Sequence, residues 1–69
     1  MLIRIDRSKL IRFMFDKAMT ASDLARRADV SMQAVRNAIE GKKLQIPSAA
    51  KIAKVLDIPA DDFIIFAQI

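Results

Sequence analysis

The stretch TASDLARRADVSMQAVRNAIEG, Thr20–Gly41, decides the fold, because it predicts two short helices in succession. Thr20 is followed three residues later by Asp23, which fits the S/T-x-x-[DE] pattern with which helices begin. An aspartate reaches back to the helix start less well than a glutamate, but the pattern still predicts a first helix over Ala21–Ala28.

A short break and a second capping residue follow this helix. Residues 29–30, Asp-Val, interrupt it, and Ser31 is of the type that accepts hydrogen bonds from the free amides of a helix start. A second helix is therefore expected over Met32–Glu40, and Gly41 suits the left-handed position just beyond a helix end. Two short helices separated by a turn of about three or four residues form a helix-turn-helix unit.

Both helices have an apolar face: Leu24, Ala25 and Ala28 on the first, and Val35, Ala38 and Ile39 on the second. The opposite face of the second helix carries Ser31, Met32, Gln33, Arg36 and Asn37. Glutamine and asparagine can pair with adenine, arginine with guanine, and methionine can touch a thymine methyl group. Any exposed helix also presents such residues to water, so on these residues alone both interpretations stay open.

The rest of the chain predicts further short elements. Asp6 is expected to cap a helix over residues 7–17, whose apolar stripe is wider than a single helix face. The elements expected after Gly41 are a loop over 42–46, a helix over 49–56 started by Pro47-Ser48, and a short helix over 60–64.

Both ends of the chain are apolar, at Leu2–Ile5 and Ile65–Ile69. We expect the two ends to pack together as a two-stranded antiparallel ribbon, which would be marginal without support from the helices or another subunit. The helix over residues 7–17 has more apolar surface than the bundle can cover. The remaining apolar patch is therefore expected to drive homodimerisation.

Composition narrows the class of protein. The 69 residues are enough for one small domain, taken as residues 1–69, with 54% hydrophobic and 29% charged residues. Such a chain is too apolar to be a disordered tail and too charged to be a membrane protein. The longest apolar run, Phe63–Ala67, is far shorter than a membrane span, and the first residues do not form a secretory signal.

Several chemistries are excluded by missing residue types. Without Cys or His, the chain lacks a thiolate, the usual general base and the usual metal ligands. The single glycine, Gly41, excludes a glycine-rich phosphate loop. Asp61 and Asp62 point apart if helical, so they suit a helix N-terminus rather than a metal or catalytic pair. We therefore expect no enzyme activity, no cofactor, no metal and no small-molecule substrate.

Charge is concentrated in the first part of the chain. Residues 1–43 contain ten basic and five acidic residues, whereas residues 44–69 contain two basic and three acidic residues. A basic surface attracts an anionic partner, and nucleic acid is expected before membrane.

Residues spread over most of the chain fit one pattern: Thr20, Asp23-Leu24-Ala25, Val30-Ser31, Val35, Gly41-Lys42, Pro47-Ser48, residues 52–58 and Phe63. Together they resemble the phage repressor/Cro-like (XRE) family of helix-turn-helix transcriptional regulators, over residues 7–65. The resemblance implies an all-α, lambda repressor-like DNA-binding domain, a compact bundle of about five short helices. It also implies that the second helix of the unit enters the major groove of operator DNA.

The resemblance assigns roles to individual residues. The residues expected to contact bases are Met32, Gln33, Arg36 and Asn37. The residues expected to contact phosphates are Thr20, Ser22, Ser31, Lys42 and Lys43. Of Arg26 and Arg27, one is expected to be ordinary solvent-facing charge.

The chain also departs from the family pattern at five positions. Asp29 replaces a frequent turn glycine, and Ala21 replaces a glutamine that helps to clamp the DNA backbone. Met14 and Ile39 replace a buried arginine–glutamate pair of some members, an exchange that is often neutral or stabilising. Glu40 stands where relatives often have asparagine, and it would repel a phosphate.

The implied function is sequence-specific binding of double-stranded DNA by a homodimeric transcriptional regulator, a repressor. The implied setting is the cytoplasm and nucleoid of a bacterium, with a bacterial or phage gene. The alternative is a protein-interaction module, such as the antitoxin of a toxin–antitoxin pair, with the apolar termini as its interaction surface.

Overall fold

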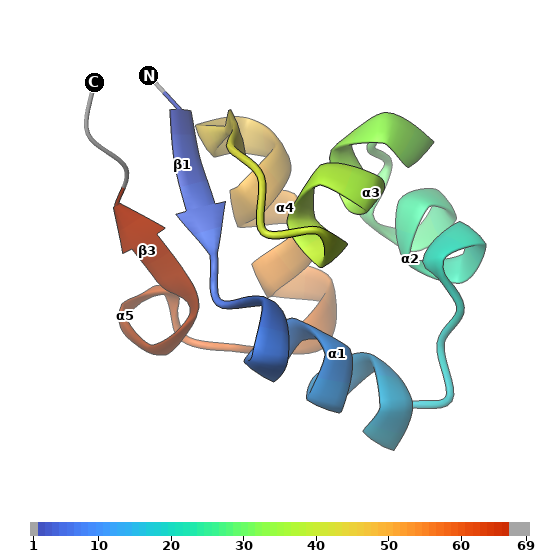
Figure 1. The fold of residues 1–69 in the computed structure, drawn as a ribbon. Helices are drawn as coiled ribbons and strands as arrows, with labels where there is room; N and C mark the ends of the chain where they lie inside the picture. The colour runs from blue at the N-terminus through green and yellow to red at the C-terminus, as the bar shows by residue number, and fades with distance from the viewer. Residues whose placement is uncertain (1, 67–69) are drawn as a thin grey trace.

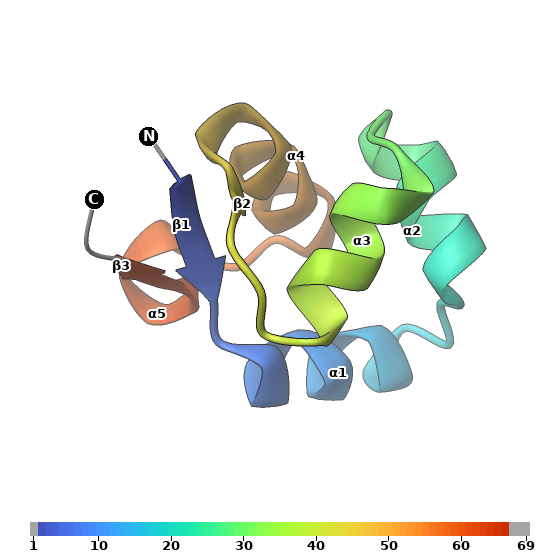
Figure 2. The ribbon, with the colours of Figure 1, turned by 45° about the horizontal axis from the view of Figure 1, so that its top comes forward.

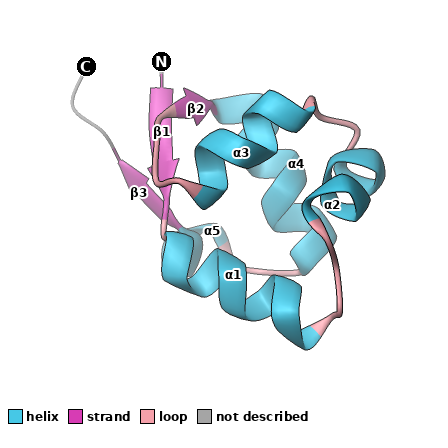
Figure 3. Ribbon diagram, turned by 45° about the vertical axis from the view of Figure 1, so that its right-hand side comes forward, coloured by secondary structure: helices cyan, strands magenta, loops and turns pink. Residues whose placement is uncertain are grey.

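A computed structural model describes residues 2–66, which form five helices and three short strands (Figure 1). The helices are α1 (Arg7–Asp16), α2 (Ala21–Ala28), α3 (Met32–Ile39), α4 (Ile46–Leu56) and α5 (Ala60–Phe63). The strands are β1 (Leu2–Ile5), β2 (Leu44–Gln45) and β3 (Ile64–Phe66). The strands lie along one side of the helices (Figure 3). The predicted helical bundle with a short terminal ribbon is confirmed.

The helix-turn-helix unit consists of α2 and α3, with the predicted caps. The Thr20 hydroxyl oxygen accepts the N–H of Asp23, and the Asp23 carboxylate accepts the N–H of Thr20, both at 3.1 Å. Ser31 caps α3 by accepting the N–H of Ala34 at 3.0 Å. Between the helices, Asp29 adopts the left-handed conformation (φ 57°, ψ 47°) in which relatives often place glycine. The turn therefore forms around aspartate, as expected.

The C-terminal end of α3 is fixed by a contact with α1. The Arg7 Nε atom donates a hydrogen bond to the carbonyl oxygen of Ile39 at 3.0 Å. Gly41 takes the predicted left-handed conformation (φ 75°), and the N–H of Lys42 returns to the carbonyl of Asn37 at 2.7 Å. A Cβ atom at position 41 would lie 3.2 Å from the Arg7 Cδ atom, so glycine is favoured there by space as well as by conformation.

The sheet joins the two ends of the chain. Strand β1 lies between β2 and β3, and both pairings are antiparallel (Figure 2). Ile3 pairs with Phe66 on one side and with Leu44 on the other. The predicted ribbon is confirmed as far as residue 66, and its expected residues 67–69 lie outside the described residues. Strand β2 corrects the expectation of a loop over 42–46, because a two-residue strand is too short to leave a periodic pattern.

Helix α4 begins earlier than the sequence suggests. It starts at Ile46 rather than Ala49, and its N-cap is Gln45, which makes no side-chain capping bond. Pro47 falls in the first turn, where the missing N–H of proline costs nothing. Near the other end of the chain, the fifth helix ends at Phe63, and Ile64, which was expected to belong to it, is the first residue of β3.

The core draws side chains from both the strands and the helices. The largest fully buried side chains are Phe63, Ile3, Ile5, Leu10, Leu24, Ile52, Leu56 and Val35. Alternation along β1 buries Ile3 and Ile5 while Leu2 and Arg4 face solvent. Within residues 2–66, no helix has the length and apolar character needed to cross a membrane.

Candidate nucleic-acid interface

The outward face of α3 carries the four residues predicted to contact bases. Met32, Gln33 and Arg36 are exposed, and Asn37 is half-buried. The Gln33 Nε2 atom donates a hydrogen bond to Asn37 Oδ1 at 2.9 Å. This bond between residues one turn apart leaves the Gln33 oxygen as an acceptor and the Asn37 amide as a donor. The pair therefore offers both functions that the major-groove edge of adenine requires.

The capping hydroxyls at the starts of α2 and α3 keep a donor available. Thr20 and Ser31 use their hydroxyl oxygens to accept backbone N–H groups, and both residues are exposed. Each hydroxyl proton can still be donated, which suits a phosphate oxygen. Ser22 is also exposed, in the first turn of α2. These hydroxyls lie where the free amides of two helix N-termini already favour an anion.

Two charged side chains of α2 form an ion pair with each other. The Arg26 guanidinium donates to the Asp23 carboxylate at 2.8 Å. The pKa of Asp23 is held below its usual range, first by the hydrogen bond from the Thr20 backbone N–H, then by hydrogen bonds with the Thr20 side chain and Arg26. Both arginines of α2, Arg26 and Arg27, are exposed, and Arg26 is the one that pairs with Asp23.

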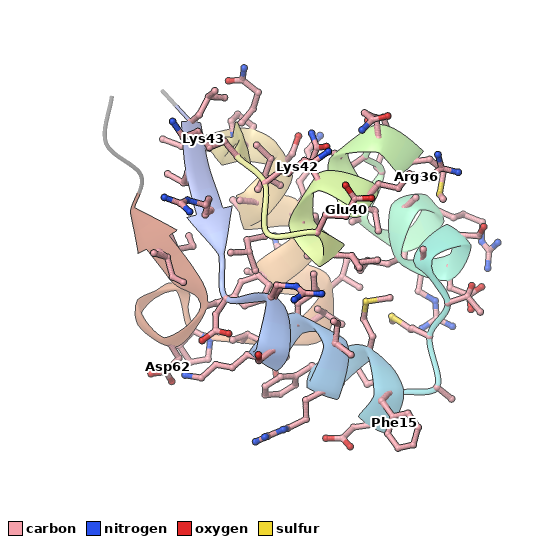
Figure 4. All side chains as sticks on the ribbon, viewed as in Figure 1. Phe15, Arg36, Glu40, Lys42, Lys43 and Asp62 are labelled. Atoms are coloured by element: carbon pink, nitrogen blue, oxygen red, sulfur yellow. The ribbon has the colours of Figure 1, made fainter. Side chains whose placement is uncertain are left out.

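The two lysines after α3 differ in their surroundings. The Lys42 ammonium lies 3.0 Å from the Glu40 carboxylate, and both side chains are exposed. Figure 4 shows these two residues beside one another at the end of α3, with Lys43 farther along towards β2. Glu40 therefore offsets the charge of Lys42, one of the two expected phosphate contacts, while Lys43 is not engaged in this pair.

A hollow beside α3 brings four of the predicted contact residues together. Its volume is about 370 Å³, and it lies between α3, β2 and the start of α4. The polar residues that line it are Ser31, Gln33, Asn37, Lys43, Gln45 and Ser48, and the apolar ones are Leu2 of β1, Ala34 and Leu44. Thr20, Ser22, Met32, Arg36 and Lys42 lie outside the lining of this hollow.

Gln45 and Ser48 were not predicted as contact residues. Their only signal in the sequence is that both are polar and lie within five residues of Lys43, around the start of α4. Because the sequence predicts a loop over residues 42–46, it gives no reason to expect these side chains beside α3. The pairing of β2 with β1 places Gln45 there, and Ser48 follows in the first turn of α4.

The family of the chain follows from comparison with known proteins. Residues 9–68 match the model of the Cro/C1-type helix-turn-helix DNA-binding domain. The chain belongs to this family. The match covers most of the Cro/C1-type domain described above, including α2, α3 and the lysines that follow them. Searches of curated proteins and of solved structures find no match.

Two departures of this Cro/C1-type domain from the family pattern have visible consequences. Met14 is buried and Ile39 half-buried, and both line a second, apolar hollow where some members bury an ion pair. Glu40 pairs with Lys42 instead of facing solvent alone. The first exchange puts apolar side chains of α1 and α3 at the positions of that ion pair, and the second places an acidic group beside the basic loop.

Proposed function

We propose that this Cro/C1-type domain binds double-stranded DNA sequence-specifically as a transcriptional repressor, with α3 in the major groove. The observation that carries the proposal is the gathering of Ser31, Gln33, Asn37 and Lys43 around one hollow. Base-reading amides and phosphate-binding groups must be adjacent in such a complex, because phosphate contacts set the register in which bases are read. The proposal treats residues 1–69 as one DNA-binding domain.

The proposed base contacts come from the outward face of α3. Met32, Gln33, Arg36 and Asn37 would face the base edges, with the Gln33–Asn37 pair suited to adenine and Arg36 to guanine. Each good bidentate contact contributes about 1–3 kcal/mol of discrimination against the wrong base.

The proposed phosphate contacts surround this face. Thr20, Ser22 and Ser31 would donate hydroxyl protons at the helix starts, and Lys42 and Lys43 would supply charge. A homodimer would place two α3 helices on two half-sites about one helical turn of DNA apart. In the proposed function, such binding at an operator represses transcription in the cytoplasm of a bacterium.

The test is selection of bound sites from random duplexes, followed by titration of single variants on the selected site. Arg36→Ala and Gln33→Ala should each reduce the free energy of binding to the selected site by about 1–3 kcal/mol and relax the preference at one base position. Lys43→Ala should weaken binding to all sequences and lower the slope of log affinity against log salt by about 1. Lys54→Ala, an exposed lysine in the last turn of α4, is the matched control and should change little.

Two results would contradict the proposal in different ways. If Arg36→Ala loses the same binding affinity on every DNA sequence, α3 does not read bases. No binding to any duplex at low salt would favour the alternative function, a protein-interaction module of the antitoxin kind.

A further inference from the structure

Two apolar side chains of α1, Phe15 and Ile11, are left largely uncovered by the described residues 2–66. Phe15 is 83% exposed and Ile11, one turn earlier, is 43% exposed. Together with Met14, Met19 and Ile39 they line an apolar hollow of about 370 Å³, and we call these five residues the α1 patch. A phenylalanine this exposed beside an apolar hollow marks an interaction surface more than a random surface position.

We propose that the α1 patch is the surface through which two copies of the chain associate, with their α1 helices antiparallel. The inference deepens the homodimer proposed above by naming its contact surface. A two-fold interface uses the same surface on both subunits, so that surface must carry both the protruding group and the cavity that receives it. The α1 patch meets this condition, because Phe15 protrudes beside the hollow that it helps to line.

The charges beside the patch favour a second copy in the antiparallel orientation. Arg12 and Asp16 are both exposed and lie one turn apart, directly after Ile11 and Phe15, so they border the same side of the patch. A two-fold axis that makes the helices antiparallel places Arg12 opposite the partner subunit's Asp16, and the reverse. It also places Phe15 between Ile11 of the partner subunit and Phe15 of the partner subunit. Parallel helices would separate the opposite charges.

The α1 patch and the candidate nucleic-acid interface are separate surfaces. None of the five patch residues lines the hollow beside α3, and none is among the nine residues proposed to contact DNA. Figure 4 shows Phe15 at the C-terminal end of α1, with Lys42 and Lys43 at the opposite end of the molecule. Association through the patch therefore uses none of the residues proposed to contact DNA.

Sedimentation equilibrium of the chain without DNA tests the proposal. The expected mass rises with concentration from 7.7 kDa towards twice that value. Phe15→Gln should weaken the dimer by at least about a hundredfold, because each dimer loses two buried phenylalanines and each contributes tenfold or more. Ile65→Thr is the matched control: Ile65 is 51% exposed on β3, outside the patch, and this change should leave the dimer intact.

A charge exchange tests the antiparallel geometry separately. Arg12→Asp and Asp16→Arg should each weaken the dimer, by about twofold to thirtyfold for two exposed ion pairs. The double variant restores both pairs across the two-fold axis and should recover most of the lost affinity. An equimolar mixture of the two single variants should also recover it, as a heterodimer. Circular dichroism of each variant controls for folding, which these exposed positions should not affect.

Several outcomes would overturn the proposal. A monomer at every concentration up to the millimolar range would do so, as would a Phe15→Gln variant that still dimerises. A dimer lost in Ile65→Thr but kept in Phe15→Gln would place the interface on the β3 edge. Failure of the charge exchange to restore association would exclude the antiparallel arrangement. Because no DNA is present, none of these results depends on whether α3 reads bases.

Discussion

Asp29 shows how one residue can limit the stability of the helix-turn-helix unit. It holds the left-handed conformation at the end of α2, and Asp57 holds nearly the same one at the end of α4 (φ 57°, ψ 44°). In both places the next residue returns its N–H to a carbonyl in the last turn, Val30 to Ala25 at 3.1 Å and Ile58 to Ala53 at 3.0 Å. Aspartate tolerates this conformation better than most residues, but glycine adopts it without steric cost.

Replacing Asp29 by glycine should therefore stabilise the domain. We expect Asp29→Gly to raise the free energy of unfolding by about 0.5–1 kcal/mol, measured by urea denaturation. Asp57→Gly provides a matched comparison at the second helix end and should give a similar gain. A loss of stability in both variants would mean that the aspartate side chains contribute more than their backbone strain costs.

Asp23 should make the stability of the domain depend on acid pH. Its pKa is held below the usual range chiefly by the Thr20 backbone N–H, then by the Thr20 side chain and Arg26. A carboxyl whose pKa is lower in the folded state stabilises fully above its unfolded pKa, and this contribution is lost as the pH falls through the folded pKa. In Asp23→Asn, the fall in stability at acid pH should be smaller than in the parent, as measured by thermal unfolding across the acid range. Asp62→Asn is the control, since Asp62 is exposed and makes no such cap. Equal acid dependence in the parent and Asp23→Asn would contradict this role.

At the scale of elements, the segment after α3 combines opposing charges. Glu40 ends α3 and pairs with Lys42, so in the proposed complex a DNA phosphate would compete with that carboxylate for the lysine. The same carboxylate repels phosphates directly.

Glu40→Gln should accordingly strengthen DNA binding. The expected gain is about twofold to tenfold at low salt, the size of one exposed ion-pair interaction, and it should diminish as salt screens the charges. Fluorescence anisotropy with a labelled duplex would measure it. Asp62→Asn removes an acidic side chain far from α3 (Figure 4) and should show a smaller change. An equal gain in both variants would point to net charge rather than to the Glu40–Lys42 pair.

The elements that the sequence predicted are those whose signals are local. Thr20, Ser31 and Gly41 mark helix ends through bonds to residues a few positions away, so these boundaries are visible in the sequence. Strand β2 depends on pairing with β1, and the Arg7 bond to Ile39 joins residues from two helices. Such non-local contacts leave no sequence pattern. This is why Gln45 and Ser48 were missed beside the predicted contact residues.

At the scale of the whole molecule, the central strand ties the helices to both chain ends. Ile5 is 2% exposed on β1, and the same strand pairs with β2 and β3. The loss of its side chain should therefore affect the whole fold. Ile5→Ala should lower the free energy of unfolding by about 2–4 kcal/mol, a large share of the total for a domain of this size. Ile65→Ala, at an exposed position on β3, is the control and should change the free energy of unfolding by about 0.5 kcal/mol or less. Similar losses in the two variants would argue against a central role of Ile5 in the core.

The pairing of Ile3 with Phe66 also bears on the order of events as the chain folds. Nearly the entire sequence lies between these two residues, so their pairing closes the longest loop joined by strand pairing within the described residues 2–66. Loop closure of this kind has the greatest entropic cost while the intervening segment is still loose. The helices, whose contacts are nearer in sequence, can form and pack first and so bring the two strands within reach. During synthesis on a ribosome, β1 could therefore pair with β3 only after most of the chain has been made.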